Sequence, residues 1–164
     1  MTVPAPIAHL AGAWSSVYGN HTSVEVVVIF GHVAALLLGG GAALAADRMI
    51  LDAARGDTAR RASCLEALPR VHRMVTRALA LAVVTGVLLT LADLETFLSA
   101  GVFYLKGALF VLLLANGLVL MAGERAARRG EDARGWRVMR AAAVASGVLW
   151  LAVVFGGVLL TKMA

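Results

Sequence analysis

The sequence has little charge and almost no cysteine. Only 15% of its 164 residues are charged and 60% are hydrophobic, whereas about a quarter of the residues in an ordinary soluble domain are charged. This composition excludes an ordinary soluble domain and favours a single integral membrane domain over residues 1–164. The one cysteine, Cys64, has no partner in the chain for a disulfide or a cysteine-based metal site. Any redox chemistry must therefore come from a cofactor.

The motifs of common enzyme classes are also missing. The chain has no HExxH, no CxxC and no phosphate-cradling glycine loop. Its triple glycine, Gly39 to Gly41, lies inside an apolar run, where close helix packing explains it better than phosphate binding. The net charge of +5 comes from arginines between apolar runs, which is typical of a topology signal and not of nucleic-acid binding. Whether the protein is an enzyme stays open.

Long apolar runs take the place of these motifs. Residues 26–46 contain no Asp, Glu, Lys or Arg, and at about 1.5 Å per residue such a helix crosses a hydrocarbon layer of about 30 Å. Runs of this kind predict four transmembrane helices, over residues 24–47, 74–93, 101–122 and 141–161. Because short connections join successive spans, we expect an all-α, up-down four-helix bundle.

Two segments flank the first span. Ile7, Leu10, Trp14 and Tyr18 recur every three or four residues, which predicts a short interfacial helix over residues 5–18. After the span, we expect the first helix to extend beyond the bilayer and to end near Pro69.

Basic residues are distributed unevenly between the two sides. All thirteen arginines lie in the loops after the first and third spans or, for Arg77, in the first turn of the second span, whereas the opposite side has only Lys106 and Lys162. By the positive-inside rule, both termini are expected to be non-cytoplasmic. The predicted location is a bacterial cytoplasmic (inner) membrane, with the chain as a multi-pass protein.

His32 is the one ionisable side chain within the first apolar run. Such a group is costly in lipid and usually faces a bundle interior or a ligand. Three interpretations remain open: a hydrogen-bonded core histidine, a haem or porphyrin ligand, and a copper or other metal ligand. Small residues near His32 leave room for a flat macrocycle, and Glu25 lies seven residues earlier on nearly the same face. The candidate cofactor-binding residues are His32, Lys106, Glu25, Gly31, Ala35 and Gly39.

Two further basic groups need an explanation. Lys106 lies about one turn inside the third span, where an ammonium group needs a carboxylate, an acidic ligand or water. His72, between Arg70 and Arg73 at the arginine-rich side, is predicted to be solvated or to face lipid headgroups. His32 lies about 24 Å from the arginine-rich end of its span, so the two histidines cannot share one iron.

The order of these features resembles known four-helix membrane families. A histidine in the first span, glycines and Asp47-Arg48 at its far end, VTGVLLTLAD in the second span and FLSAGVFYLKGALFVLLLANG leading the third are similar to the HemJ-type protoporphyrinogen oxidases and the CopD-like copper-resistance membrane domains. In the HemJ family a first-helix His and a third-helix Lys are associated with haem binding and activity, and His32 and Lys106 stand at those positions.

The resemblance implies a haem b or related tetrapyrrole, used in electron transfer or porphyrin oxidation. In this interpretation His32 binds the iron, and Lys106 pairs with a propionate because a charged amine has no lone pair for a metal. Two alternatives remain: a non-catalytic accessory subunit of a larger respiratory or photosynthetic membrane complex, and a copper- or metal-handling protein. Expected partners are the lipid bilayer and a larger complex or a second copy, without nucleic acid.

Overall fold

The computed structural model describes residues 4–130 and 132–163, and of residues 132, 161 and 163 only the backbone. The expected domain of residues 1–164 thus includes residues 1–3, 131 and 164, which lie outside the described part. Within that part the chain is helical and contains no strand. Its helices are α1 (Ala5–Asn20), α2 (Thr22–Arg55), α3 (Thr58–Ala92), α4 (Leu94–Ser99), α5 (Gly101–Arg128) and α6 (Asp132–Met163).

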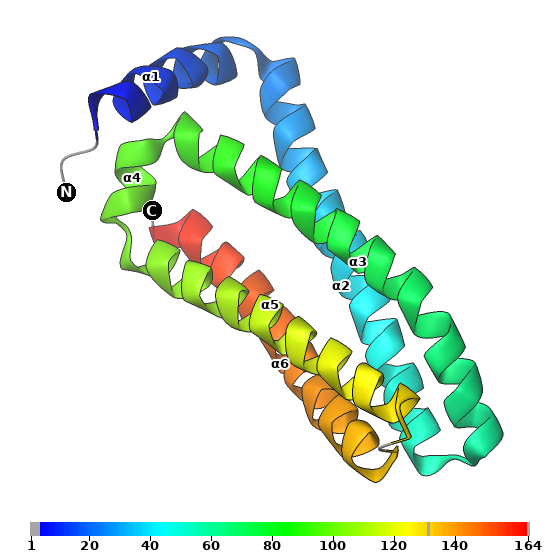
Figure 1. Cartoon of the computed structure of the whole chain (residues 1–164). Coiled ribbons are helices and arrows are strands. Elements are labelled where there is room, and N and C mark those ends of the chain that lie inside the picture. The colour runs from blue at the N-terminus through cyan, green and yellow to red at the C-terminus, as the bar shows by residue number, and fades with distance from the viewer. Residues whose placement is uncertain (1–3, 131, 164) are drawn as a thin grey trace.

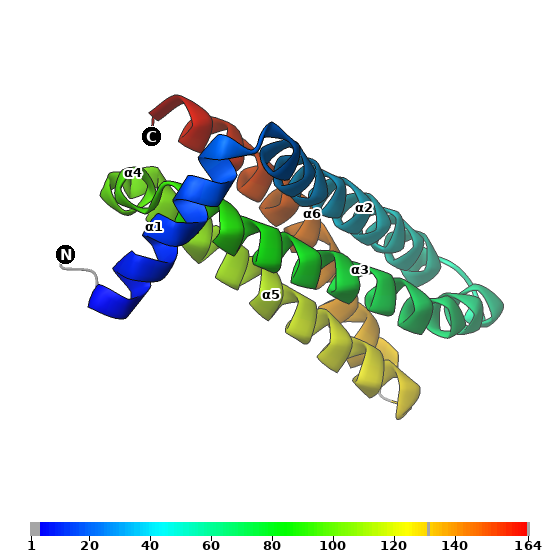
Figure 2. The same ribbon diagram turned by 90° about the horizontal axis from the view of Figure 1, so that it is seen from above.

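The four long helices form two antiparallel hairpins. Helices α2 and α3 pack along each other, as do α5 and α6, and α2 also packs against α6 to join the hairpins (Figures 1 and 2). Helices α2, α3 and α5 and the segment Ala133–Leu160 of α6 are each long and apolar enough to cross a membrane. The expected all-α bundle with four such helices is confirmed.

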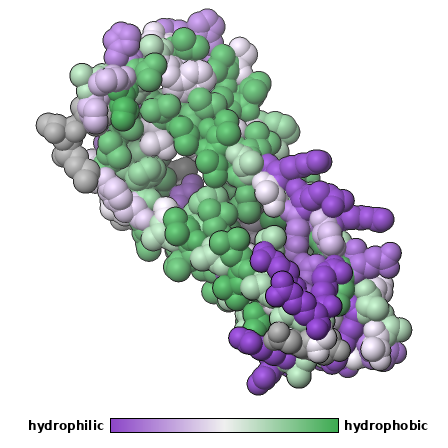
Figure 3. All heavy atoms as spheres, viewed as in Figure 1, coloured by the Kyte–Doolittle hydropathy of each residue, from purple (hydrophilic) through white to green (hydrophobic). Residues whose placement is uncertain are grey.

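The two ends of the bundle differ in composition. Both hairpin turns lie at one end, where hydrophilic side chains gather in Figure 3; we call this the arginine end. Helices α1 and α4 and the last turns of α6 lie at the other, which we call the terminal end (Figure 1). The surface between them is largely apolar, as expected for helices in a lipid bilayer.

Two clusters of buried side chains hold the hairpins together. The larger lies toward the arginine end and draws on all four long helices, with Ile50, Leu68, Leu120 and Met139 among its members. The smaller surrounds Trp150 and includes Ala43, Leu113 and Val153. Toward the terminal end the hairpins separate in Figure 1, and the surface between them is hollowed in Figure 3.

The helix boundaries at the arginine end differ from the expected ones. Helix α2 ends at Arg55, and α3 begins at Thr58 and continues without a break through Pro69, so the prediction of a helix ending near Pro69 is wrong. Proline cannot donate the backbone hydrogen bond to the carbonyl four residues earlier, here that of Leu65. The Arg128 guanidinium of α5 donates to that Leu65 carbonyl instead. A contact from another hairpin thus satisfies the group that Pro69 leaves free.

Short helices cover the terminal end. The expected helix over residues 5–18 is present as α1, two residues longer, and it lies across the end of α3 in Figure 2. Trp14 Nε1 donates to the Leu88 carbonyl over 2.8 Å, and Ser15 Oγ to the Ala92 carbonyl over 2.8 Å. Both bonds hold α1 against α3, and the second satisfies a carbonyl in the last turn of α3 that has no partner within the helix. The acidic linker between α3 and α5 is itself a short helix, α4, capped by Asp93.

Candidate functional site

His32 lies on α2 at its interface with α3. Its ring nitrogen Nδ1 is 3.0 Å from Thr85 Oγ1 on α3. The ring packs against Gly86, where a Cβ would lie 3.3 Å from His32 Cε1, so this glycine leaves the space that the imidazole occupies. His32 lies within the first apolar run, and Thr85 and Gly86 of α3 hold its ring against that helix.

The hydrogen bonds of Thr85 assign the proton of the imidazole. Thr85 Oγ1 lies 2.7 Å from the Leu81 carbonyl and 3.3 Å from that of Ala82. A carbonyl only accepts, so the single hydroxyl proton is donated within α3 and the oxygen accepts from His32. His32 therefore carries its proton on Nδ1 and a lone pair on Nε2, and its ring also interacts with the Ala82 backbone. A metal-binding histidine is commonly oriented in this way by a bond from its other nitrogen.

Lys106 approaches the same depth from the second hairpin. It lies along two glycines of α6: a Cβ on Gly157 would be 3.6 Å from Lys106 Nζ, and one on Gly156 would be 3.7 Å from Lys106 Cβ. Trp150 of α6 packs against Gly39 of α2. His32 lies seven residues before Gly39, and Gly157 lies seven residues after Trp150. Because α2 and α6 are antiparallel, both steps lead about 10 Å toward the terminal end.

The Lys106 side chain has no counter-ion among the described residues. It is half-buried, and neither an ion pair nor a hydrogen bond of its ammonium group is found in that part of the chain. A cation in such a place is stabilised by an anion or by water. The fold thus places the two candidate residues, 74 positions apart in the chain, at about the same depth of the bundle.

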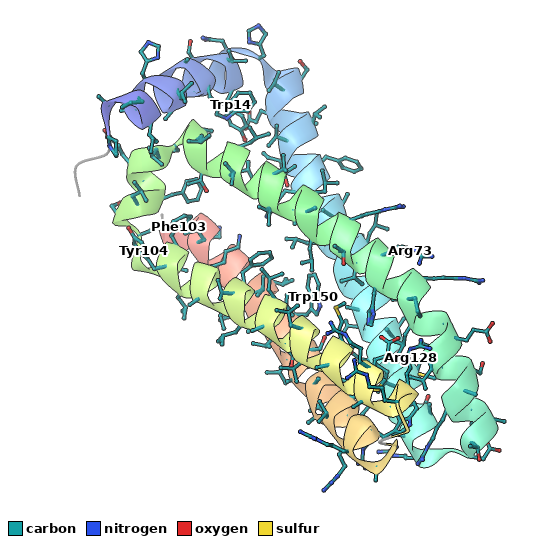
Figure 4. All side chains as sticks on the ribbon, viewed as in Figure 1. Trp14, Arg73, Phe103, Tyr104, Arg128 and Trp150 are labelled. Atoms are coloured by element: carbon teal, nitrogen blue, oxygen red, sulfur yellow. The ribbon has the colours of Figure 1, made fainter. Side chains whose placement is uncertain are left out.

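The site lies between the hairpins, above an apolar floor. Trp150 is 4% exposed and points into the space between the hairpins in Figure 4. The close helix pairs are α2–α3, α5–α6 and α2–α6, whereas the polar contacts of α3 with α5 lie at the arginine end. Between α3 and α5 at the depth of His32, the hairpins are therefore separated.

The remaining predicted residues serve mainly to pack helices. A Cβ on Gly39 would lie 2.9 Å from Ala78 Cβ and 3.5 Å from Trp150, so protein side chains fill the space beside it. Gly31 lies against Thr85, and Ala35 is 2% exposed.

Glu25 lies toward the beginning of α2, seven residues before His32. It is exposed in the first turn of α2, near α1. Burial and, to a smaller extent, the Glu25 charge raise the pKa of Tyr18 above its ordinary value. Glu25 is therefore associated with α1 rather than with the space between the hairpins.

The second histidine occupies a different environment from the expected one. His72 was predicted to be solvated or to face lipid headgroups, but its side chain is only 21% exposed and its Nδ1 lies 3.3 Å from Glu124 Oε2 on α5. Glu124 Oε1 also accepts from Arg128 Nε over 2.9 Å and Nη2 over 2.8 Å. Sequence reasoning missed Glu124, because a carboxylate among six loop arginines looks like an ordinary surface charge. Its spacing of four residues to Arg128 was the available signal.

A second buried carboxylate lies on α2. Asp47 is 6% exposed, and its Oδ2 has no hydrogen-bond partner in the described part of the chain. Among the described residues, no group of three or more His, Cys, Asp or Glu side chains could hold a metal ion.

Comparisons with protein-family models, with curated proteins and with solved structures give no match to this chain.

Proposed function

We propose that the protein binds a haem b or a related tetrapyrrole between its two hairpins, with His32 as the iron ligand and Lys106 as the partner of a carboxylate. One observation carries the proposal: an oriented imidazole with an available Nε2 and an unpaired ammonium group share one depth of an apolar membrane bundle.

The donor set suits such a group. Imidazole is a common axial ligand of haem iron, and a tetrapyrrole combines a flat apolar body with acidic substituents. An apolar floor at Trp150 and a cation at Lys106 complement those two parts. When bound, a haem supplies one-electron redox chemistry.

The chain's own residues have separate tasks in this proposal. Thr85 holds the His32 tautomer, and Gly86 leaves room for its ring. Trp150 and its apolar neighbours exclude water from below the site. Gly31, Ala35, Gly39 and Glu25 are not part of the ligand contacts that we propose, because they face other helices or solvent.

We also propose that the arginine end faces the cytoplasm of a bacterial cell, which makes the site non-cytoplasmic. The support is the thirteen arginines at that end against two lysines at the other. A reporter that is active only in the cytoplasm, fused after Ala164, should then be silent. A strong signal would show that the C-terminus is cytoplasmic and that the orientation is the opposite of the proposed one.

Expression under haem-replete conditions and purification in mild detergent test the cofactor. The proposal expects Soret absorption in the parent protein, its loss in His32→Ala, and weakened binding in Lys106→Met. The exposed His21 is the matched control, so His21→Ala should keep the full spectrum. A folded parent without absorption after haem titration, or retention of the haem by His32→Ala, would overturn the proposal. A parent that is degraded without other membrane proteins would favour the accessory-subunit alternative.

A further inference from the structure

A cleft with three arginines opens between α2 and α3 at the arginine end. Its volume is about 770 Å³. The side chains that give it its chemical character are Arg48, Arg55, Arg60, Asp52, Ser63 and Met49. Three guanidinium groups face one carboxylate, so the cleft carries an excess of positive charge.

None of these three guanidinium groups has a partner among the described residues. The arginines that make ion pairs or side-chain hydrogen bonds in that part of the chain are others, among them Arg61, Arg128 and Arg137. The turn that closes the cleft is shaped around Arg60, because a Cβ on Gly56 would lie 2.8 Å from Arg60 Cδ. Three unpaired cations close together repel one another, and a bound anion would relieve that repulsion.

The depth of the cleft matches the edge of the hydrocarbon layer. Arg48 comes two residues after the apolar run that ends at Ala46. On the same helix face, Leu38 lies seven residues before the cleft residue Ala45 and is 56% exposed. A molecule with its head in the cleft would therefore have exposed apolar helix surface directly beside it.

We propose that this cleft binds the phosphate group of an anionic phospholipid. Guanidinium groups match phosphate oxygens by paired hydrogen bonds, and the Ser63 hydroxyl can donate a further one. Basic pockets between membrane helices at the headgroup level are suited to such lipids. Free inorganic phosphate offers the same oxygens, but the adjoining apolar surface favours a ligand with acyl chains. The proposal does not depend on the tetrapyrrole site or on the orientation of the chain.

A smaller cleft makes a less suitable site. It lies between α5 and α6, has a volume of about 290 Å³ and is lined by Arg125, Arg129 and Arg134. Arg134 already interacts with another group. The larger cleft, whose arginines are all unpaired, is therefore the one that we assign to a lipid.

Native mass spectrometry of the full chain in detergent tests the proposal, with phosphatidylglycerol and phosphatidylcholine as the probes. The cleft variant is Arg48→Gln/Arg55→Gln/Arg60→Gln. Its control is Arg70→Gln/Arg73→Gln/Arg77→Gln, which removes the same charge from exposed positions of α3 outside the cleft. Since one arginine near an anionic lipid contributes about a fivefold gain, we expect roughly 100-fold weaker phosphatidylglycerol binding in the cleft variant. The control should change by less than about threefold.

The outcomes separate the two sources of phosphate. Preference for phosphatidylglycerol that is lost only in the cleft variant supports the proposal. Equal loss in both variants would show general charge attraction and overturn it. Thermal stabilisation by inorganic phosphate equal to that by phosphatidylglycerol, abolished in the cleft variant, would assign the cleft to free phosphate and also overturn it. If the cleft variant does not fold by circular dichroism, the corresponding triple lysine variant, which keeps the charge but loses the paired donors, should still bind more weakly than the parent.

Discussion

His32 and His72 are alike in several respects and differ in one that decides their roles. Both are half-buried, and both use Nδ1 to contact a side chain on a neighbouring helix. The Nε2 atom of His72 is enclosed and has no partner in the described part of the chain. His32 is oriented by an uncharged hydroxyl and lies at the depth of Lys106, which has no counter-ion among the described residues. Burial of an imidazole alone therefore does not indicate a ligand site; the groups around it do.

The same contrast holds for the two ends of the bundle. At the arginine end, His72 of α3 contacts Glu124 of α5, which also accepts from Arg128 of its own helix, and the larger buried cluster closes the space between the hairpins. At the depth of His32 and Lys106 the hairpins are separated, and the polar groups lack partners from the other hairpin. The arginine end can therefore supply the stability that an open site elsewhere requires.

The stability of the protein should be most sensitive to added side-chain volume at the arginine end. In Gly135→Ala the new Cβ would lie 2.5 Å from the backbone nitrogen of Ala127, so α5 and α6 must move apart. We expect a loss of about 3 kcal/mol in the free energy of unfolding, measured by denaturant titration in mixed micelles. Gly117→Ala, in the same helix pair but with nothing within 4 Å of the new Cβ, is the control and should be neutral or stabilising. Equal losses of stability in Gly135→Ala and Gly117→Ala would contradict the close contact between Gly135 and Ala127.

Removing the carboxylate that joins the hairpins should have the next largest effect. In Glu124→Ala, Arg128 and His72 lose their shared partner, and because Arg128 is 42% exposed, water replaces part of the loss. We expect a decrease of about 2 to 3 kcal/mol in the free energy of unfolding. Glu66→Ala removes an exposed carboxylate from α3 and should change it by less than about 0.5 kcal/mol. A similar small change in Glu124→Ala would mean that the pair does not hold the hairpins together.

The four spans could be predicted because run length and charge are properties of the local sequence. The continuation of α3 through Pro69 could not, since the group that replaces its lost hydrogen bond is Arg128, 59 residues later. His32 and Lys106 were found by their depth in apolar segments. Their meeting, the Thr85 contact and the role of Glu124 depend on which helices are neighbours, and the sequence pattern alone does not determine that.

The substitute hydrogen bond at Pro69 can be tested by a double-mutant cycle. Arg128→Leu should destabilise the parent, whereas in a Pro69→Ala background the restored backbone N–H can itself donate to Leu65. Arg128→Leu should then cost less, with a coupling free energy of about 1.5 kcal/mol between the two positions. The measurement is again unfolding in mixed micelles. Additive effects of the two changes would show that Arg128 does not compensate for the proline.

The smallest expected effect on stability is at Thr85, and it is the most informative about His32. Thr85→Val keeps the side-chain shape but removes the acceptor of His32 Nδ1. One lost hydrogen bond should lower the free energy of unfolding by about 1 kcal/mol. If His32 binds a metal, loss of its orienting partner should also weaken haem binding by about 10- to 100-fold in a Soret titration.

A matched control separates these two effects. The Thr90 hydroxyl donates to the Gly86 carbonyl over 2.9 Å, as that of Thr85 does to Leu81, but no histidine bonds to it. Thr90→Val should therefore leave haem affinity unchanged, and Thr85→Ser, which keeps a hydroxyl, should restore most of it. If Thr85→Val and Thr90→Val weaken haem binding equally, then Thr85 does not orient the imidazole for a ligand. His32 would then have a structural role like that of His72.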